Sequence, residues 1–357
     1  MRIGILTFHR AHNYGAVLQC YALQRFLISL GHDAKVIDYN KKELWAYYSW
    51  YRKSEFDMAY RFSWKMPVRV YRLHKRIKPR KDRYNKFVDF QENILKLDSV
   101  SSINDAPYDL ILIGSDQVWN TAITHGFDPF YWGTFDKPAK TKVATYAASM
   151  KKYWTKEEEP IAIENLLRLN AISVREESVG EHVKSIAPQL KVTAVPDPVL
   201  LLSDKDWSGI AVKPKIKEKY AFFYQAWNSN DVLNTAKNIA KERGLKLVVL
   251  SADVNGPNSD ICRSASPQEF IGWIKNADLV LTSSFHALAF SILLNKDFYA
   301  INLNVGKDDR LKNLVSLFHL EERLINDETE ASALSPFDGQ EVLDNLRNTA
   351  INYLNSI

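Results

Sequence analysis

Short, continuous apolar runs recur along this chain and alternate with stretches of helical periodicity. In the first half they fall at residues 2–8, 34–39, 109–114, 142–147, 171–174 and 192–195, and in the second half at 220–224, 246–250, 279–282 and 298–302. Runs of this length are typical of parallel strands that helices cover on both faces. The first forty residues show one complete unit: an apolar strand, a periodic stretch closed by Gly31, and a second strand. The pattern therefore predicts an α/β protein built from βαβ units.

The length of the chain and the spacing of these runs predict two domains. A chain of 357 residues exceeds what one hydrophobic core usually organises. Short crossovers force parallel pairing, so we expect two Rossmann-like, doubly wound domains that face each other across a cleft. The expected parts are an N-terminal α/β domain at 1–202 with an insertion at about 41–100, a linker at 203–219, a C-terminal α/β domain at 220–338, and a final helix at 339–357 that could pack on either domain.

Composition narrows the class of protein. The chain is 46% hydrophobic and 25% charged, as in ordinary folded proteins. Cys20 and Cys262 are far apart and lack metal-ligand spacing, so we expect neither a metal site nor a structural disulfide. The apolar start is too short for a signal peptide and no later run would span a membrane, which predicts a cytoplasmic protein. A net charge of +5 with a pI near 8.9 is too small to imply nucleic acid as a partner.

The expected insertion differs in composition from the rest of the chain. Aromatic residues crowd residues 45–64, and ten Lys and Arg follow at 65–86 with only Asp82 opposing them. Two interpretations remain open. The segment is either a helical insertion with a solvated basic face, or a patch that rests on anionic lipid of the inner membrane surface, beside a lipid-linked acceptor, with its rings at headgroup level.

Polar residues follow the first and third expected strands, where ligands bind in open α/β sheets. After the first strand, Asn13 and Gly15 stand in a donor-rich turn that could seat an anion or a sugar hydroxyl; the alternative is that Asn13 only caps the following helix. After the strand at 109–113, Gly114 permits close approach of a ligand or of backbone. Ser115 and Asp116 then suit either a polar contact in the cleft or a helix cap.

Two later positions extend this set of candidates. Arg175 ends the strand at 171–174 and is a natural fork for a carboxylate or phosphate, although an ion pair with Glu176 or Glu177 is the alternative. The stretch 276–290, NADLVLTSSFHALAF, leads from an apolar strand through hydroxyl residues to His286 in the first turn of an apolar helix. This junction suits proton transfer, with a structural histidine as the alternative. The Pro-flanked Asp197 is expected to serve only its turn.

Five of these pieces together resemble the polysaccharide pyruvyl transferase family. They are NYGAVLQ at 13–19, GSDQVWN at 114–120, SVRE at 173–176, DPVL at 197–200 and the stretch 277–290, in the family's order. The resemblance implies a fold similar to the GT-B glycosyltransferases. It also implies transfer of a pyruvyl group from phosphoenolpyruvate to a sugar of a surface polysaccharide, such as a capsule or exopolysaccharide, or of its lipid-linked precursor, forming a ketal. Roles for Asp116, Arg175 and His286 follow from the same resemblance.

One position departs from the family's pattern. Members with the best established activity look like they carry Arg two residues before the motif His, where this chain has Ser284. We expect Lys307 to supply that charge, with Arg310 as the second choice. Under this interpretation His286 transfers protons, Arg175 and Lys307 bind the donor's anions, and Asp116 engages an acceptor hydroxyl. The other expected substrate contacts are Asn13, Gly15, Gly114, Ser115, Ser284 and Phe285. Phosphoenolpyruvate is the donor substrate, and the chemistry needs no separate cofactor or metal.

Two other classes of function fit the same pattern. A glycosyltransferase of similar fold would hold a nucleotide sugar in its second half, with His286 at the diphosphate. A non-catalytic, two-lobed sugar-binding protein is the third class. The missing export signal and the placement of Asp, Arg and His at expected strand ends argue against it.

Overall fold

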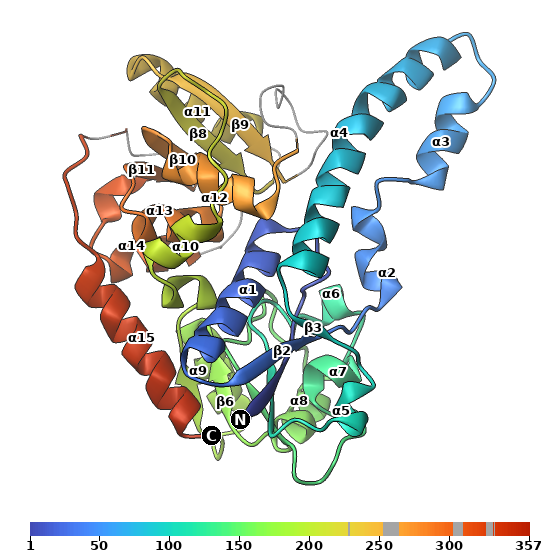
Figure 1. The fold of residues 1–357 in the computed structure, drawn as a ribbon, viewed down its shortest axis with the longest axis vertical. Helices are drawn as coiled ribbons and strands as arrows, with labels where there is room; N and C mark the ends of the chain where they lie inside the picture. Colours follow the sequence, from blue (N-terminus) through green and yellow to red (C-terminus); the bar gives the residue numbers. More distant parts are fainter. Residues whose placement is uncertain (228, 253–263, 303–309, 326–330, 332) are drawn as a thin grey trace. The chain divides into compact units, whose positions relative to one another are not determined.

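The computed structural model describes residues 1–227, 229–252, 264–302, 310–325, 331 and 333–357 (Figure 1). Two compact units divide the chain. The first unit comprises Met1–Ala46, Gln91–Leu202 and Gln340–Ile357, and the second comprises Tyr47–Phe90 and Ser203–Gly339. Each unit has a five-stranded sheet, and every strand pairing in these two sheets is parallel. The predicted α/β class with two doubly wound sheets is confirmed.

The first unit is built around β1 (Arg2–Leu6), whose neighbours are β2 (Asp33–Ile37) and β4 (Leu110–Ile113). The sheet order β3-β2-β1-β4-β5 is completed by β3 (Leu97–Asp98) and β5 (Lys142–Thr145). A separate parallel pair consists of β6 (Ile172–Val174) and β7 (Val192–Ala194). The order reverses between β1 and β4, so their carboxyl ends form a topological switch point, the usual ligand position in such sheets.

The helices of the first unit connect and cover these strands. They are α1 (Tyr14–Ser29), α5 (Ser102–Asp105), α6 (Thr121–Thr124), α7 (Pro129–Trp132), α8 (Glu159–Leu166), α9 (Glu177–Ile186), the 3-10 helix η2 (Pro198–Leu201) and α15 (Gln340–Asn355). The final helix α15 packs on this unit. Its Tyr353 hydroxyl donates to the Thr145 carbonyl (2.6 Å) and its Arg347 Nε donates to the Leu201 carbonyl (3.1 Å).

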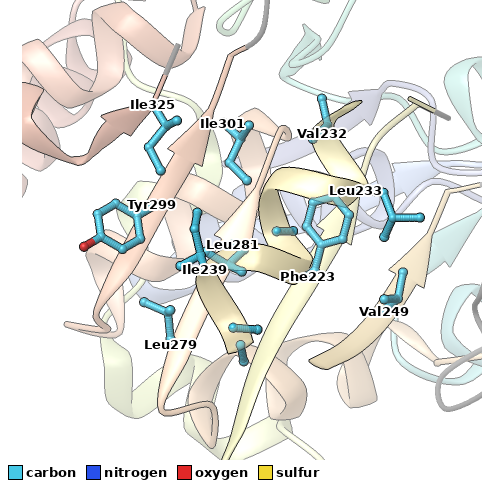
Figure 2. Packing of buried hydrophobic residues seen from close by; sticks show 13 residues of the cluster. Phe223, Val232, Leu233, Ile239, Val249, Leu279, Leu281, Tyr299, Ile301 and Ile325 are labelled. Carbon is cyan, nitrogen blue, oxygen red and sulfur yellow. The ribbon is translucent and has the colours of Figure 1, made fainter. Parts of the chain in front are cut away.

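The second unit repeats the arrangement with the strand order β12-β11-β10-β8-β9. Its strands are β8 (Tyr220–Gln225), β9 (Lys246–Ser251), β10 (Leu279–Thr282), β11 (Phe298–Ile301) and β12 (Leu324–Ile325). Its helices outside the 47–90 segment are α10 (Asp204–Ile210), α11 (Asn230–Glu242), α12 (Pro267–Lys275), α13 (Phe285–Leu293), α14 (Arg310–Leu317) and the 3-10 helix η3 (Glu321–Arg323). Figure 2 shows one side of its core, where Val232 and Ile239 of α11 belong to one buried cluster with Phe223 and Leu281 of the sheet.

The segment expected as an insertion of the first domain folds into α2 (Lys42–Trp45), the 3-10 helix η1 (Ala46–Tyr48), α3 (Lys53–Tyr60) and the long α4 (Met66–Asn93). Residues 47–90 belong to the second unit, because α4 is bonded to it. Arg83 Nη1 donates to the carbonyls of Ser251 (2.8 Å) and Ala252 (2.9 Å). A solvated basic face, one of the two interpretations of this segment, therefore does not include Arg83, nor Arg80, which is buried and paired with Glu55 of α3 (2.8 Å).

Among the described helices, none combines the length with the apolar character that crossing a bilayer would require.

Candidate functional site

The loop after β4 has a backbone that its sequence makes specific. Gly114 has φ +117°, and a Cβ built there would lie 2.3 Å from the Tyr146 carbonyl oxygen, so only glycine fits. Ser115 is buried; its hydroxyl donates to the Ala147 carbonyl (3.1 Å) and its own carbonyl accepts from Thr7 Oγ1 (2.8 Å). The loop is thus bonded to segments that follow both β1 and β5.

Asp116 is partly exposed and has a left-handed backbone conformation, with φ 80°. Its Oδ1 accepts from the Gln117 backbone N–H (2.8 Å), and its carbonyl accepts from the Ser149 N–H (3.0 Å). It does not cap a helix, since α6 is capped by Asn120. A left-handed non-glycine residue costs about 1 kcal/mol and is found disproportionately at functional positions. Of the two interpretations of Asp116, the helix cap is excluded.

Arg175 follows β6 and is enclosed by polar partners, its side chain being 3% exposed. Nε donates to Glu176 Oε1 (2.8 Å), Nη1 to Asp197 Oδ2 (3.0 Å) and Nη2 to Ser149 Oγ (3.2 Å). Burial by itself would lower the pKa of Arg175, but the adjacent carboxylates outweigh burial and raise the pKa above its ordinary value. Of the ion pairs that the sequence left open as the alternative, the one with Glu176 is present, and Arg175 also pairs with Asp197, which the sequence did not predict.

Ser149 connects the two candidates of the first unit. Its backbone N–H donates to the Asp116 carbonyl, while its hydroxyl accepts from Arg175. Asp197 does more than serve its turn, because it both accepts from the Val199 N–H (3.0 Å) and pairs with Arg175. The structure therefore brings Asp116 and Arg175 together, one partly exposed carboxylate in front of one buried cation.

At the end of β1, Asn13 caps α1, with its Oδ1 accepting from the Ala16 N–H (3.3 Å), and Gly15 is buried in the first turn. Beside them lies a charged cluster that the sequence analysis did not single out. Both Arg10 and the buried His9 bond Asp38, at 2.6–2.8 Å and 2.9 Å. The parallel pairing of β1 with β2 places Asp38 next to the turn at 9–12, a contact that the linear sequence does not display.

In the second unit, His286 lies where the sequence predicted, in the first turn of α13 directly after β10. It is partly buried, and its ring stands edge-on to Phe285 at a centroid distance of 5.3 Å. The Ser284 N–H donates to Thr282 Oγ1 (3.0 Å), while the Ser284 side chain makes no capping bond. The strand order reverses between β8 and β10, so His286 also stands at a switch point.

Two further residues, Lys307 and Arg310, were predicted to supply the positive charge that binds the donor. Lys307 lies outside the described residues, and Arg310 is the first residue of α14. In the part of the chain that the structure describes, no group of three or more His, Cys, Asp or Glu side chains is arranged to hold a metal ion.

The fold and these positions define a protein of two α/β units with polar, titratable groups at the carboxyl ends of both parallel sheets. The chain belongs to the polysaccharide pyruvyl transferase family, whose model matches residues 13–304. It is thereby a transferase of polysaccharide biosynthesis, and the matched range contains Asp116, Arg175 and His286. No curated protein matches the sequence.

Solved structures of low sequence identity are similar along most of the chain. The S. aureus MnaA–UDP structure has 10% identity and a TM-score of 0.44, covering 99% of this chain and 88% of its own. The UDP-GlcNAc 2-epimerase from Methanocaldococcus jannaschii has 11% identity and a TM-score of 0.42, covering 98% and 100%. E. coli heptosyltransferase WaaC with ADP-2-deoxy-2-fluoro heptose has 12% identity and a TM-score of 0.38, covering 100% and 99%. The fold assignment rests on the strand orders of the chain itself.

Proposed function

We propose that this protein transfers the pyruvyl group of phosphoenolpyruvate to two hydroxyls of one sugar, forming a ketal, in a cytoplasmic step of surface polysaccharide synthesis. Membership of the family over residues 13–304 is the observation that carries the proposal. The acceptor is a polysaccharide or its lipid-linked precursor, which the protein reaches through peripheral contact with the inner membrane surface. Phosphoenolpyruvate is the donor substrate, with no separate cofactor.

The reaction balances with proton transfers alone. A proton adds to the methylene carbon of phosphoenolpyruvate, the adjacent carbon becomes electrophilic, and a sugar oxygen bonds to it while its hydroxyl proton leaves. The C–O bond to phosphate breaks, and a second hydroxyl closes the ketal and loses its proton. One of the two released protons replaces the proton given to carbon, and the other leaves with inorganic phosphate. The step therefore needs a proton donor and acceptor and a cationic environment for the anions.

We assign His286 to protonation of the methylene carbon and Asp116 to the attacking hydroxyl, as base or orienting group. The backbone supports the second assignment, because a carboxylate in a constrained loop at a switch point is already positioned before the acceptor binds. Because the three guanidinium nitrogens of Arg175 already have partners, two of them carboxylates, we assign it a positioning role: it holds Ser149, which bonds the Asp116 carbonyl. Lys307 remains the proposed direct contact of the donor's anions, with Arg310 as the alternative.

The decisive test is a donor comparison on the full chain. Phosphoenolpyruvate should raise the thermal unfolding temperature and, with a cytoplasmic sugar acceptor fraction, release inorganic phosphate in step with ketal formation detected by mass. UDP- and ADP-sugars form the second arm. Stabilisation by a nucleotide sugar with no response to phosphoenolpyruvate would replace this proposal with the glycosyltransferase. Stabilisation by free sugars alone, without turnover, would favour the binding protein.

A further inference from the structure

The tip of the α3–α4 hairpin, here residues 58–78, exposes apolar side chains to an unusual extent. Phe62 is 97% exposed and Trp64 is 84% exposed, and both lie in the turn between the two helices. The other large apolar residues exposed there are Met58, Tyr60, Val68 and Tyr71. Single exposed apolar residues are common, but several of them close together in sequence, with two large rings at one turn, indicate an interaction surface.

The same tip is strongly cationic. Residues 58–78 contain seven Lys and Arg and no Asp or Glu. Those with exposed side chains at the tip are Arg61, Lys65, Arg72, Lys75, Arg76 and Lys78. Aromatic rings interleaved with exposed cations fit the headgroup region of an anionic bilayer, where rings lie at the interface and cations approach phosphates. A soluble polyanion offers the charge without an apolar phase for the rings, so the rings favour lipid.

The tip differs from the part of α4 that follows it, residues 80–86, here called the root. The root is bonded to other elements of the second unit. Farther along α4, Arg83 is committed to the Ser251 and Ala252 carbonyls, and Lys86 bonds Glu269 of α12 (2.9 Å). At 1.5 Å per residue, Met66 and Arg83 are about 25 Å apart along the helix. Ser251 ends β9, so the root is bonded at the carboxyl end of a strand in the same sheet as β10, the strand that precedes His286 of α13. Figure 1 shows α3 beside the first half of α4. The ion pair between Glu55 of α3 and Arg80, near the middle of α4, joins the two helices.

We propose that the hairpin tip docks on an anionic lipid surface, with Phe62 and Trp64 at headgroup level and the exposed cations against lipid phosphates. The inference extends the proposed function by naming the surface that contacts the membrane. Only the link between this contact and a lipid-linked acceptor rests on the proposed function. When the tip contacts lipid, the root of the same helix remains bonded to the end of β9 in the sheet of the second unit. The contact surface is thus narrower than the whole basic segment, because Arg80 and Arg83 are turned into the protein.

The test is sedimentation of the full chain with vesicles of phosphatidylcholine and phosphatidylglycerol in equal parts, without any substrate. The ring variant carries Phe62→Ser and Trp64→Ser, and the charge variant carries Lys65→Gln, Arg72→Gln, Lys75→Gln and Arg76→Gln. Each variant should bind about tenfold or more weakly than the parent. A matched charge control removes four exposed lysines elsewhere in the second unit: Lys213→Gln, Lys215→Gln, Lys217→Gln and Lys219→Gln. Ile161→Ser with Leu167→Ser is the matched apolar control.

Parental binding in both controls, with loss in both tip variants, is the expected result. Added salt should weaken the parent toward the level of the charge variant, because the Debye length shortens. The proposal is overturned if the parent protein does not sediment with these vesicles, or if the tip variants bind them as strongly as the parent does. Dextran sulfate is the competing ligand. Binding to it that exceeds vesicle binding and is unaffected in the ring variant would assign the surface to a soluble polyanion instead. Since no phosphoenolpyruvate is present, failure here leaves the proposed activity untouched.

Discussion

At the scale of single residues, Asp116 combines a strained backbone with a side chain that we assign to the acceptor hydroxyl. Asp116→Gly removes the carboxylate and its bond to the Gln117 N–H, but also relieves the left-handed backbone at φ 80°. We expect its free energy of unfolding to stay within about 1 kcal/mol of the parent's, because the two effects oppose each other. Turnover should nevertheless fall by about two to four orders of magnitude.

Asp116→Ala is the matched control, since it removes the same carboxylate and keeps the backbone cost. It should be as inactive as Asp116→Gly, and its free energy of unfolding should be about 1 kcal/mol lower than that of Asp116→Gly. Urea denaturation and initial rates on the same preparations separate the two effects. Near-parental turnover in either variant would return Asp116 to a structural role.

His12, in the loop between β1 and α1, carries a prediction about pH. Burial, with a smaller contribution from the positive Arg10, lowers the pKa of His12 from 6.5 to about 4. The unfolded chain therefore takes up a proton near pH 6.5, whereas the folded protein does so only near pH 4. Between these values the unfolded state binds more protons, so stability falls as pH falls. From about pH 7 to pH 5 the parent should lose about 1–2 kcal/mol more than His12→Gln. Parallel pH profiles for the two proteins would contradict this assignment.

At the scale of elements, the strands and α1 could be predicted because their determinants are local. The apolar runs at 279–282 and 34–39 match β10 and most of β2, since burial on both faces demands continuous apolar sequence. The two-residue strands β3 and β12 carry no such run and exist only through their neighbours. Likewise, His286 was found from its strand-to-helix junction, whereas the Asp38 cluster depends on strand pairing.

The long helix α4 is bonded to the second unit through Arg83. Arg83→Leu keeps an apolar stem but leaves the carbonyls of the buried Ser251 and the exposed Ala252 without this donor. We expect a loss of about 2 kcal/mol in stability of the second unit, together with faster proteolysis within 47–90. Lys81→Leu is the control, because Lys81 is exposed and its described contact is with the Trp50 ring, not with a strand end. Equal protease sensitivity of the two variants would show that α4 is held by other contacts.

At the scale of the whole molecule, the chain does not follow the order of its units. It leaves the first unit at residue 46, returns at 91, and returns again with α15. Apolar periodicity predicts that α4 and α15 are helices, but which unit they join is decided by side chains such as Arg83 and Tyr353, whose partners lie far away in sequence. Composition alone therefore assigned the segment 41–100 to the unit that flanks it in sequence.

Asp116 belongs to the first unit and His286 to the second, and the proposed function assigns both a role in the same reaction. If Asp116 and His286 act in one reaction, on the donor and acceptor of the same turnover, their effects should not be independent. Asp116→Asn and His286→Gln should each lower turnover by about two to four orders of magnitude. Turnover of the double variant should be only slightly lower than that of the less active single variant. Phosphate release and ketal formation would be measured together for all four proteins, with unfolding curves to confirm that each is folded. Losses that multiply would indicate independent steps, and a His286→Gln variant that retains turnover would return this histidine to a structural role.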